Sequence, residues 1–141
     1  MKPLFVLDAS VSAGWIFQDQ ADAYCDGVLG ALRTGSCIAP ALWKLEMANM
    51  LLTAERKGKI SRMDSERSVS ALKDLPIKID AEGGERYLDA VRDLGRDYGL
   101  SAYDAVYLDT ALREGLPLAT RDLALAKALR EAGGSVFGAS E

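Results

Sequence analysis

Four acidic residues have the chemistry and the spacing to bind a divalent metal ion. Asp8 and Asp122 each follow a short apolar run that is typical of a buried strand. Asp104 lies near the start of a predicted helix, and Glu46 lies inside another. The carboxyl ends of parallel strands meet in one crevice, where carboxylates from distant parts of a chain can converge. Because like charges repel, such a cluster favours a hard cation bound by oxygen ligands, such as Mg2+.

Alternating strands and helices are expected to position these carboxylates. Apolar runs and turn residues predict strands at residues 2–7, 36–39, 77–79, 118–120 and, briefly, 136–137. Helices are predicted at residues 11–17, 19–33, 41–57, 61–73, 82–98, 101–114 and 122–132. Asp19 is expected to cap the second helix, and Ser61 with Asp64 fits the capping-box pattern. Strands that alternate with helices predict an α/β fold with a mostly parallel sheet and right-handed crossovers.

The length and composition indicate one globular domain, residues 1–141. Hydrophobic residues make up 49% of the chain, which is enough for a proper core. The longest apolar runs, such as residues 4–7, are far shorter than the roughly 20 residues that cross a bilayer, so no membrane association is expected. Because a strand is predicted almost at the N-terminus, a signal peptide is not expected, and the expected location is cytoplasmic.

The residue types that are missing exclude several kinds of catalyst. The chain has no histidine, which excludes a Ser-His-Asp triad and every zinc site that needs imidazole. Cys25 and Cys37 are too few for a disulfide framework and are expected to be buried free thiols. The chemistry that remains is mostly that of carboxylates.

The net charge of −4 argues against nucleic-acid binding over a broad basic surface. It leaves room for a local basic rim beside an acidic site. One positive segment surrounds Gly58 and consists of Arg56, Lys57, Lys59 and Arg62. The ordinary explanation of such a segment is a solvated helix end followed by a turn.

Three of the four acids also have an ordinary explanation as helix caps. Asp8 can cap the first helix, although Ser10 can do so instead and leave Asp8 free. Ser101-Ala102-Tyr103-Asp104 fits the capping-box pattern, with Asp in place of the usual Glu or Gln. Asp122 can cap the last helix, and the Thr120 hydroxyl at the strand end can serve a local turn or bind water or phosphate.

Glu46 lies on a narrow polar stripe of the helix predicted at residues 41–57. At roughly 100° per residue, Glu46, Asn49 and Thr53 fall on one face, with Arg56 near its end. Apolar residues flank this stripe on both sides, with Ala41, Leu45, Ala48 and Leu52 on one side and Trp43, Met47 and Met50 on the other. Such a stripe indicates either a wet cleft or a buried hydrogen-bond network that holds the helix in place.

The candidate residues occur in four segments of fixed order and spacing. The segments are Phe5-Val6-Leu7-Asp8-Ala9-Ser10, Pro40-Ala41-Leu42-Trp43-Lys44-Leu45-Glu46-Met47-Ala48-Asn49, Gly99-Leu100-Ser101-Ala102-Tyr103-Asp104-Ala105-Val106-Tyr107-Leu108 and Leu118-Ala119-Thr120-Arg121-Asp122. In these segments the sequence resembles PIN-domain ribonucleases, specifically the VapC-type toxins of bacterial and archaeal toxin–antitoxin pairs. The resemblance covers essentially the whole chain, and Ser-Ala-Tyr-Asp-Ala is its most specific part. It implies a three-layer α/β/α sandwich and an endoribonuclease that depends on Mg2+ or Mn2+.

The resemblance also implies roles for individual residues. The catalytic acids and metal ligands would be Asp8, Glu46, Asp104 and Asp122, with Ser10, Asn49 and Thr120 beside them. A metal-bound water would attack the phosphodiester in line, and Glu46 is a candidate to orient that water. Candidates to contact RNA phosphates are Arg121 and the basic segment Arg56, Lys57, Lys59 and Arg62. Many relatives carry a further acid after the last of the four. Leu123-Ala124-Leu125-Ala126 stand there in this chain, which weakens the expectation of a tightly bound second metal.

The family further implies a VapB-type antitoxin partner and a homodimer. The C-terminal segment of such an antitoxin typically lies in a hydrophobic groove and places a basic side chain beside the acidic site. The apolar residues that could line this groove are Trp15, Ile16, Phe17, Trp43, Met47 and Met50. The alternative is that these side chains belong to the core.

Other α/β proteins with acidic pockets fit the sequence less well. A phosphoacceptor receiver domain needs adjacent acids after the first strand, whereas Asp8 is followed by Ala9. Asp80 does follow Ile79, but no lysine follows Thr120 directly. The more serious alternative is a catalytically inactive PIN-fold module that binds RNA or a protein partner. The intact acidic set favours the enzyme, because repulsion among carboxylates without a metal would cost stability.

Overall fold

A computed structural model describes residues 2–138 and contains a central sheet of four parallel strands. The strands are β1 (Val6–Leu7), β2 (Cys37–Pro40), β3 (Ile77–Asp80) and β4 (Leu118–Ala119), in the spatial order β3-β2-β1-β4. Val6 is in register with Ile38 on one side and with Leu118 on the other. Val136, in the strand expected at residues 136–137, makes a single parallel bridge with Leu118. The predicted parallel sheet is therefore confirmed.

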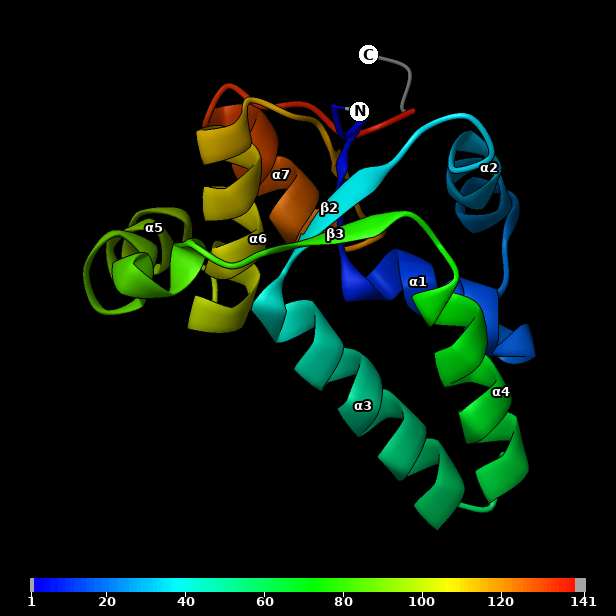
Figure 1. Ribbon diagram of the computed structural model, residues 1–141. Coiled ribbons are helices and arrows are strands. Elements are labelled where there is room, and N and C mark those ends of the chain that lie inside the picture. The colour runs from blue at the N-terminus through cyan, green and yellow to red at the C-terminus, as the bar shows by residue number, and fades with distance from the viewer. Residues whose placement is uncertain (1, 139–141) are drawn as a thin grey trace.

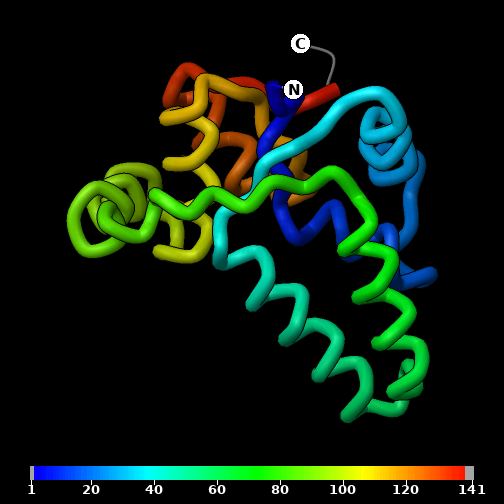
Figure 2. The backbone as a smooth tube through the Cα atoms, in the orientation of Figure 1, coloured from blue at the N-terminus to red at the C-terminus, as the bar shows by residue number. Residues whose placement is uncertain are grey.

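Seven α-helices surround this sheet in the described part of the chain. They are α1 (Ala9–Ile16), α2 (Ala23–Ala31), α3 (Ala41–Arg56), α4 (Arg62–Lys73), α5 (Arg92–Tyr98), α6 (Ala102–Glu114) and α7 (Leu123–Glu131). In Figure 1, α6 and α7 lie to the left of the strands, α1 and α2 lie to the right, and α3 and α4 extend downward as a pair. This arrangement confirms the predicted three-layer α/β/α sandwich. Figure 2 shows that the backbone passes from β1 directly into α1 and from β2 directly into α3.

The core forms where the helices pack on the sheet. Phe5, Val6 and Leu7 are completely buried, as their continuous apolar run predicted. Cys25 and Cys37 are buried and free, which confirms the prediction for both thiols. Burial raises the pKa of the Cys25 thiol to about 11 and that of the Cys37 thiol to about 12, so both are neutral near pH 7.

The second predicted helix begins later than expected because another residue caps it. Asp19 lies in a 3-10 turn, η1 (Gln18–Gln20), and the prediction that it caps the helix is wrong. The cap is Asp22, whose Oδ1 accepts a hydrogen bond from the Cys25 amide at 2.7 Å. By contrast, the capping box predicted for Ser61 and Asp64 is present in full at the start of α4.

The helix expected at residues 82–98 is divided into three parts. A 3-10 turn, η2 (Gly83–Arg86), and a π-helical segment, η3 (Tyr87–Val91), precede α5. Two adjacent glycines weaken helix formation at this start. Gly83 is also required by packing, since a Cβ atom there would lie 2.9 Å from Arg113 Nη2 and 3.0 Å from Asp80 Oδ2.

None of the helices within residues 2–138 combines the length and the apolar composition that a bilayer crossing requires.

Candidate active site

Asp8 lies at the carboxyl end of β1, and two hydroxyl groups hold its carboxylate. Ser10 Oγ and Thr120 Oγ1 each donate a hydrogen bond to Asp8 Oδ2 at 2.7 Å. Asp8 occupies the N-cap position of α1, but its side chain makes no capping bond. Ser10 does not cap the helix either, because its Oγ donates to Asp8 and accepts from the Arg121 amide at 3.0 Å. The capping explanation of Asp8 is therefore wrong, since the hydroxyl groups of Ser10 and Thr120 hold its carboxylate instead.

Thr120 and Asp122 form a turn that leads from β4 into α7. Thr120 Oγ1 accepts a hydrogen bond from the Asp122 amide at 3.0 Å while it donates to Asp8. Asp122 caps α7, because its Oδ1 accepts a hydrogen bond from the Leu125 amide at 3.1 Å. Within residues 2–138, no hydrogen bond to Asp122 Oδ2 is found. The cap thus engages one carboxylate oxygen and leaves the other available as a ligand.

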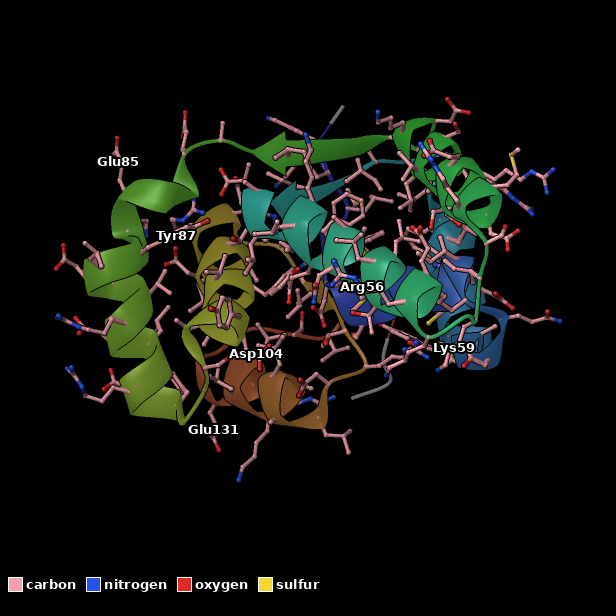
Figure 3. The ribbon with its side chains drawn as sticks, turned by 90° about the horizontal axis from the view of Figure 1, so that it is seen from below. Arg56, Lys59, Glu85, Tyr87, Asp104 and Glu131 are labelled. Atoms are coloured by element: carbon pink, nitrogen blue, oxygen red, sulfur yellow. The ribbon has the colours of Figure 1, made fainter. Side chains whose placement is uncertain are left out.

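Asp104 makes only half of the capping box that its sequence predicts. The Ser101 hydroxyl accepts a hydrogen bond from the Asp104 amide at 3.1 Å. The return bond is missing: at α4 the Ser61 amide donates to the Asp64 carboxylate at 2.9 Å, whereas the Ser101 amide makes no such bond to Asp104. The Asp104 carboxylate is therefore not used to cap α6. Figure 3 shows Asp104 at the start of α6.

Glu46 is half-buried and accepts a hydrogen bond from a residue that the sequence did not single out. Tyr107 donates from its hydroxyl to Glu46 Oε1 at 2.5 Å, although 61 positions separate the two residues. Tyr107 lies three residues after Asp104 and is completely buried. The only sequence signal was this spacing, which puts Tyr107 on the same helix face as Asp104.

The polar stripe of α3 lies at the border between a buried and an exposed face. The Trp43, Met47 and Leu51 face is buried, whereas Leu45 and Leu52 on the opposite flank are 68% and 45% exposed. The far end of the stripe lines a groove of about 220 Å³ together with the end of α3 and the turn after α1. Its lining includes Asn49, Thr53, Lys57, Lys59 and Phe17. Glu46 forms a hydrogen bond with Tyr107, while Asn49 and Thr53 line the groove, so the stripe serves both the hydrogen bonding and the cleft predicted for it.

The four acids influence one another electrostatically. Burial raises the pKa of Asp8, its bonds from Thr120 and Ser10 lower it, and the charge of Asp122 raises it. Burial also raises the pKa of Glu46, to which the charges of Asp8 and Asp104 add. The pKa of Asp104 is raised by burial and then by the charges of Asp122 and Asp8. Each of the four carboxylates therefore lies close enough to at least one other for their charges to interact.

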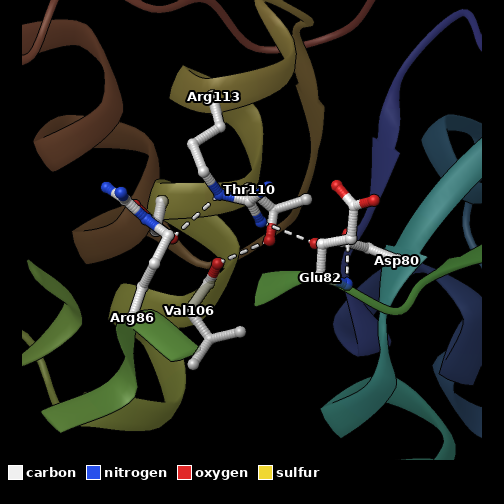
Figure 4. A network of polar contacts seen from close by, with 7 residues as sticks. Asp80, Glu82, Arg86, Val106, Thr110 and Arg113 are labelled. Atoms are coloured by element: carbon white, nitrogen blue, oxygen red, sulfur yellow. Dashed lines mark hydrogen bonds and ion pairs between the residues drawn. The ribbon is translucent and has the colours of Figure 1, made fainter. Parts of the chain in front are cut away.

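Asp80 also ends a strand, but it does not belong to this group. Arg113 Nη2 donates to Asp80 Oδ2 at 2.6 Å, and Arg113 Nε donates to Asp109 Oδ2 at 3.1 Å. Arg86 binds Asp109 from the other side at 2.9 Å. Figure 4 shows this network between the end of β3, η2 and α6. Because Asp80 is neutralised inside the chain, it is not free to join the four candidate acids.

The four candidate acids have the ligand chemistry of a divalent cation site, although their side chains do not yet surround a single ion position. Carboxylate oxygens are the ligands that Mg2+ and Mn2+ prefer, and their mutual repulsion is what a cation would relieve. No group of three or more Asp, Glu or Cys side chains within residues 2–138 is arranged closely enough to hold a metal as it stands. Repulsion is expected to keep the carboxylates apart when no cation is bound. Asp8, Glu46, Asp104 and Asp122 are the residues that could hold it.

Arg121 is engaged within the chain. Its Nε donates to the Ser10 carbonyl at 2.8 Å, and its Nη2 donates to the same oxygen. Its Nη1 donates to the Gln20 carbonyl at 2.6 Å and to Asp22 Oδ2 at 3.1 Å. The guanidinium thus braces the β4–α7 turn against α1 and the turn after it. The role in RNA binding that the sequence suggested for Arg121 stays a prediction.

The other basic candidates lie away from the acids, at the end of α3. Arg56, Lys57, Lys59 and Arg62 are all exposed, and Arg56 and Lys59 are labelled in Figure 3. Lys59 forms an ion pair with Asp19 at 3.9 Å, and both side chains are more than half exposed. Such a pair contributes little to stability, so Lys59 remains free to bind another anion.

The apolar residues suggested for a partner groove mostly belong to the core. Phe17, Trp43 and Met47 are buried, and Trp43 Nε1 donates to the Ser12 hydroxyl at 2.9 Å. The half-buried Trp15 donates to the Cys25 carbonyl at 2.8 Å. An apolar groove of about 410 Å³ lies between α3, α4 and β3, and the predicted groove residues Trp43 and Met47 contribute to its wall. Its lining includes Met47, Leu51, Leu72, Ile77 and Ile79, with Lys44 and Lys73.

Comparisons with known proteins agree with this architecture. The sequence profile of the PIN domain matches residues 5–130. The crystal structure of PAE2754 from Pyrobaculum aerophilum is similar, with a TM-score of 0.70 and 23% identity, over 96% of this chain and 84% of that one. FitAcB from Neisseria gonorrhoeae has a TM-score of 0.66 and 18% identity, over 95% of this chain and 96% of that one. At these identities the two structures support the fold alone. No curated protein sequence was found to match.

Proposed function

This chain belongs to the PIN domain family, and we propose that it is a Mg2+- or Mn2+-dependent endoribonuclease. The observation that carries the proposal is the set of hydrogen bonds that link the segments of the four acids. The Thr120 hydroxyl joins Asp8 to the Asp122 turn, and Tyr107 joins Glu46 to α6, the helix that carries Asp104. Three of the four acids have a raised pKa because of burial and neighbouring negative charge. A protein that kept these carboxylates without a cation would lose stability for no gain.

The chain's own residues would orient the ligands and the substrate. Ser10 and Thr120 hold Asp8 by its Oδ2 atom, and the capping bond of Asp122 fixes one oxygen while the other stays free. A bound divalent ion would supply a more acidic water and offset the negative charge that develops on the phosphate. Glu46 is proposed to orient the attacking water.

The groove beside Asn49 and Thr53 is the proposed path of the RNA backbone. It leads along α3 toward Lys57 and Lys59, whose side chains are exposed. Lysines position a nucleic acid through its phosphates without reading sequence. Because the net charge of the chain is −4, this local rim rather than the whole surface would attract RNA.

We further propose that the chain is the toxin of a VapBC-type toxin–antitoxin pair, which the four motif segments support. The apolar groove between α3, α4 and β3 is the proposed surface for the C-terminal segment of the antitoxin. The exposed apolar flank of α3, with Leu45 and Leu52, supports the predicted homodimer. The single-domain organisation of residues 1–141 and the cytoplasmic location stay predictions.

A catalytically inactive PIN-fold module that binds RNA or a protein is the second candidate function. Two observations favour it. No three ligand side chains in the described part of the chain already surround a cation position, and Leu123-Ala124-Leu125-Ala126 stand where many relatives have a further acid. Metal-dependent thermal stabilisation would not separate the two candidates, because metal binding is not catalysis.

An RNA cleavage assay separates the endoribonuclease from the inactive binding module. Total RNA is incubated with antitoxin-free protein in Mg2+, Mn2+ or EDTA, and wild type is compared with Asp104→Asn. Asp97→Asn is the matched control, because Asp97 is an exposed acid on α5. Discrete fragments from wild type and Asp97→Asn, formed only with metal, are expected. No cleavage with either metal would favour the binding module, and equal cleavage by Asp104→Asn would indicate contamination or a different site.

A further inference from the structure

Tyr107 heads the fully buried side chains by volume in the described part of the chain. Its hydroxyl donates to Glu46 Oε1 at 2.5 Å and thereby links α6 to α3. Tyr107 and Asp104 are three residues apart and lie on the same face of α6. One turn of α6 therefore carries one candidate acid and the hydrogen-bond donor to a second one.

Glu46 depends on this donor for its position. Oε1 is engaged by the phenol, and no other hydrogen bond to Glu46 is found within residues 2–138. Glutamate has several rotatable side-chain bonds, and an unanchored carboxylate would sample several rotamers. The negative charges of Asp8 and Asp104 act on Glu46, and repulsion would turn its carboxylate away from them. The bond to Tyr107 opposes that movement.

We propose that Tyr107 is a positioning residue that fixes Glu46 Oε1 and leaves Oε2 as the oxygen available to the site. This role rests on the endoribonuclease function proposed above. Tyr107 cannot contact RNA, because its side chain is 0% exposed. It acts only through Glu46, so its effect on turnover should disappear when Glu46 can no longer serve the reaction.

Tyr107→Phe removes the hydroxyl and keeps the ring, so the core volume is nearly unchanged. Thr110→Val is the matched control, because Thr110 lies on the same helix, is 1% exposed and loses a single hydroxyl bond, to the Val106 carbonyl at 2.8 Å. Its hydroxyl has no contact with the four acids. Thermal melting of both variants checks that each is folded at the assay temperature.

The test is a double-mutant cycle between Tyr107→Phe and Glu46→Gln. kcat and KM are measured in Mn2+ on a pool of fluorescently labelled random-sequence oligoribonucleotides. Tyr107→Phe is expected to lower kcat about 10- to 100-fold, the range of a hydrogen bond to a charged group, with KM changed less than about twofold. In the Glu46→Gln background the same substitution should change kcat less than about twofold. Thr110→Val should leave kcat within about twofold of wild type.

Three results would overturn the role of Tyr107. Tyr107→Phe could leave kcat unchanged, Thr110→Val could cause an equal fall, or the effects of Tyr107→Phe and Glu46→Gln could multiply in full. The last result would show that Tyr107 acts independently of Glu46, as a merely structural residue would.

Mn2+ affinity of the same variants, measured without RNA by titration calorimetry, separates this proposal from the proposed function. Tyr107→Phe is expected to weaken Mn2+ binding about tenfold in the wild-type background and not in the Glu46→Gln background. If wild type binds Mn2+ with this coupling but cleaves no RNA, the nuclease proposal fails, whereas the positioning of Glu46 by Tyr107 in a metal site stands. If wild type cleaves RNA and neither cycle shows coupling, the role of Tyr107 fails alone. A wild type that neither binds Mn2+ nor cleaves RNA would overturn both.

Discussion

Thr120 Oγ1 donates a hydrogen bond to Asp8 Oδ2 at 2.7 Å, across 112 positions of sequence. Thr120 Oγ1 also accepts a hydrogen bond from the Asp122 amide at 3.0 Å. A single hydroxyl therefore connects the ends of β1 and β4 and fixes the relative positions of two candidate acids. β1 and β4 are parallel neighbours in the sheet, so their carboxyl ends lie side by side and bring these residues together.

Thr120→Val should lower the rate of RNA cleavage, because it removes one hydroxyl bond to Asp8 and the acceptor of the Asp122 amide. A bond to a charged group is worth about 1.5–3 kcal/mol, and a fall in kcat of at least roughly tenfold is expected. Thr120→Ser keeps the hydroxyl and should retain most of the activity. Cleavage kinetics of the two variants provide the measurement, and equal activity of Thr120→Val and wild type would argue against the role of this hydroxyl.

In EDTA, the stability of the protein should fall as the pH rises through the range in which the candidate acids lose their protons. The pKa of Asp8, Glu46 and Asp104 is raised in the folded state, mainly by burial. A raised pKa means that the folded state binds protons more tightly than the unfolded chain. The stability that these groups contribute is therefore fully present at a pH below their ordinary pKa values of 3.8 and 4.5. It is lost as the pH rises through their raised pKa values in the folded state.

Asp104→Asn isolates this effect from the other acids of the protein. Asp22 and Asp64 have a lowered pKa, chiefly because backbone amides bind their carboxylates, and they act in the opposite direction. Asp22 and Asp64 contribute equally to the variant and to wild type, so their effects cancel when the two melting temperatures are compared. In EDTA near pH 7 the variant should melt at a higher temperature, by roughly 3 °C for about 1 kcal/mol, and the gain should shrink below pH 4. A lower melting temperature near pH 7 would contradict the proposed repulsion.

Arg113→Met should destabilise the fold strongly, since it leaves Asp80 and Asp109 without their shared partner. Both carboxylate side chains are at most 6% exposed. Removing one member of a buried charge network typically costs about 3–5 kcal/mol. Arg96→Met is the control, because Arg96 is 67% exposed and its ion pair with Asp93 lies at the surface. Urea unfolding measures the free energy of unfolding of both variants. A similar small loss of that free energy in Arg113→Met and Arg96→Met would mean that the network contributes little to stability.

Lys57→Ala combined with Lys59→Ala should weaken RNA binding without a change in the chemical step. The expected result is a higher KM with kcat within about twofold of wild type. For single-stranded RNA, two lost phosphate contacts should reduce the slope of log K against log salt concentration by about 1.4. Lys2→Ala combined with Lys78→Ala removes two exposed lysines elsewhere and is the charge-matched control. An equal effect of both pairs would indicate a response to net charge and not a binding path.

Much of the fold follows from local sequence patterns. The apolar run at Phe5–Leu7 predicted a buried strand because a strand covered on both faces has no polar alternation. The Ser61–Asp64 capping box formed as predicted, since its two bonds span only three residues. The alternation of strands and helices was sufficient to predict a parallel sheet, because parallel strands need a crossover. The positions of Asp8, Asp104 and Asp122 near strand ends and helix starts followed from the same patterns.

Contacts between distant segments depended on packing that no local pattern contains. Ser101 and Asp104 have the same spacing as Ser61 and Asp64, yet only the second pair closes its box. Tyr107 reaches Glu46 because α6 and α3 meet across the end of the sheet. The sequence alone indicated most of the strands, caps and candidate ligands, because those patterns depend on neighbours a few positions away. It was wrong at α2, where Asp22 and not Asp19 is the cap. The tertiary structure alone decided which carboxylates stay free and which are neutralised, because partners such as Tyr107 and Arg113 come from other elements.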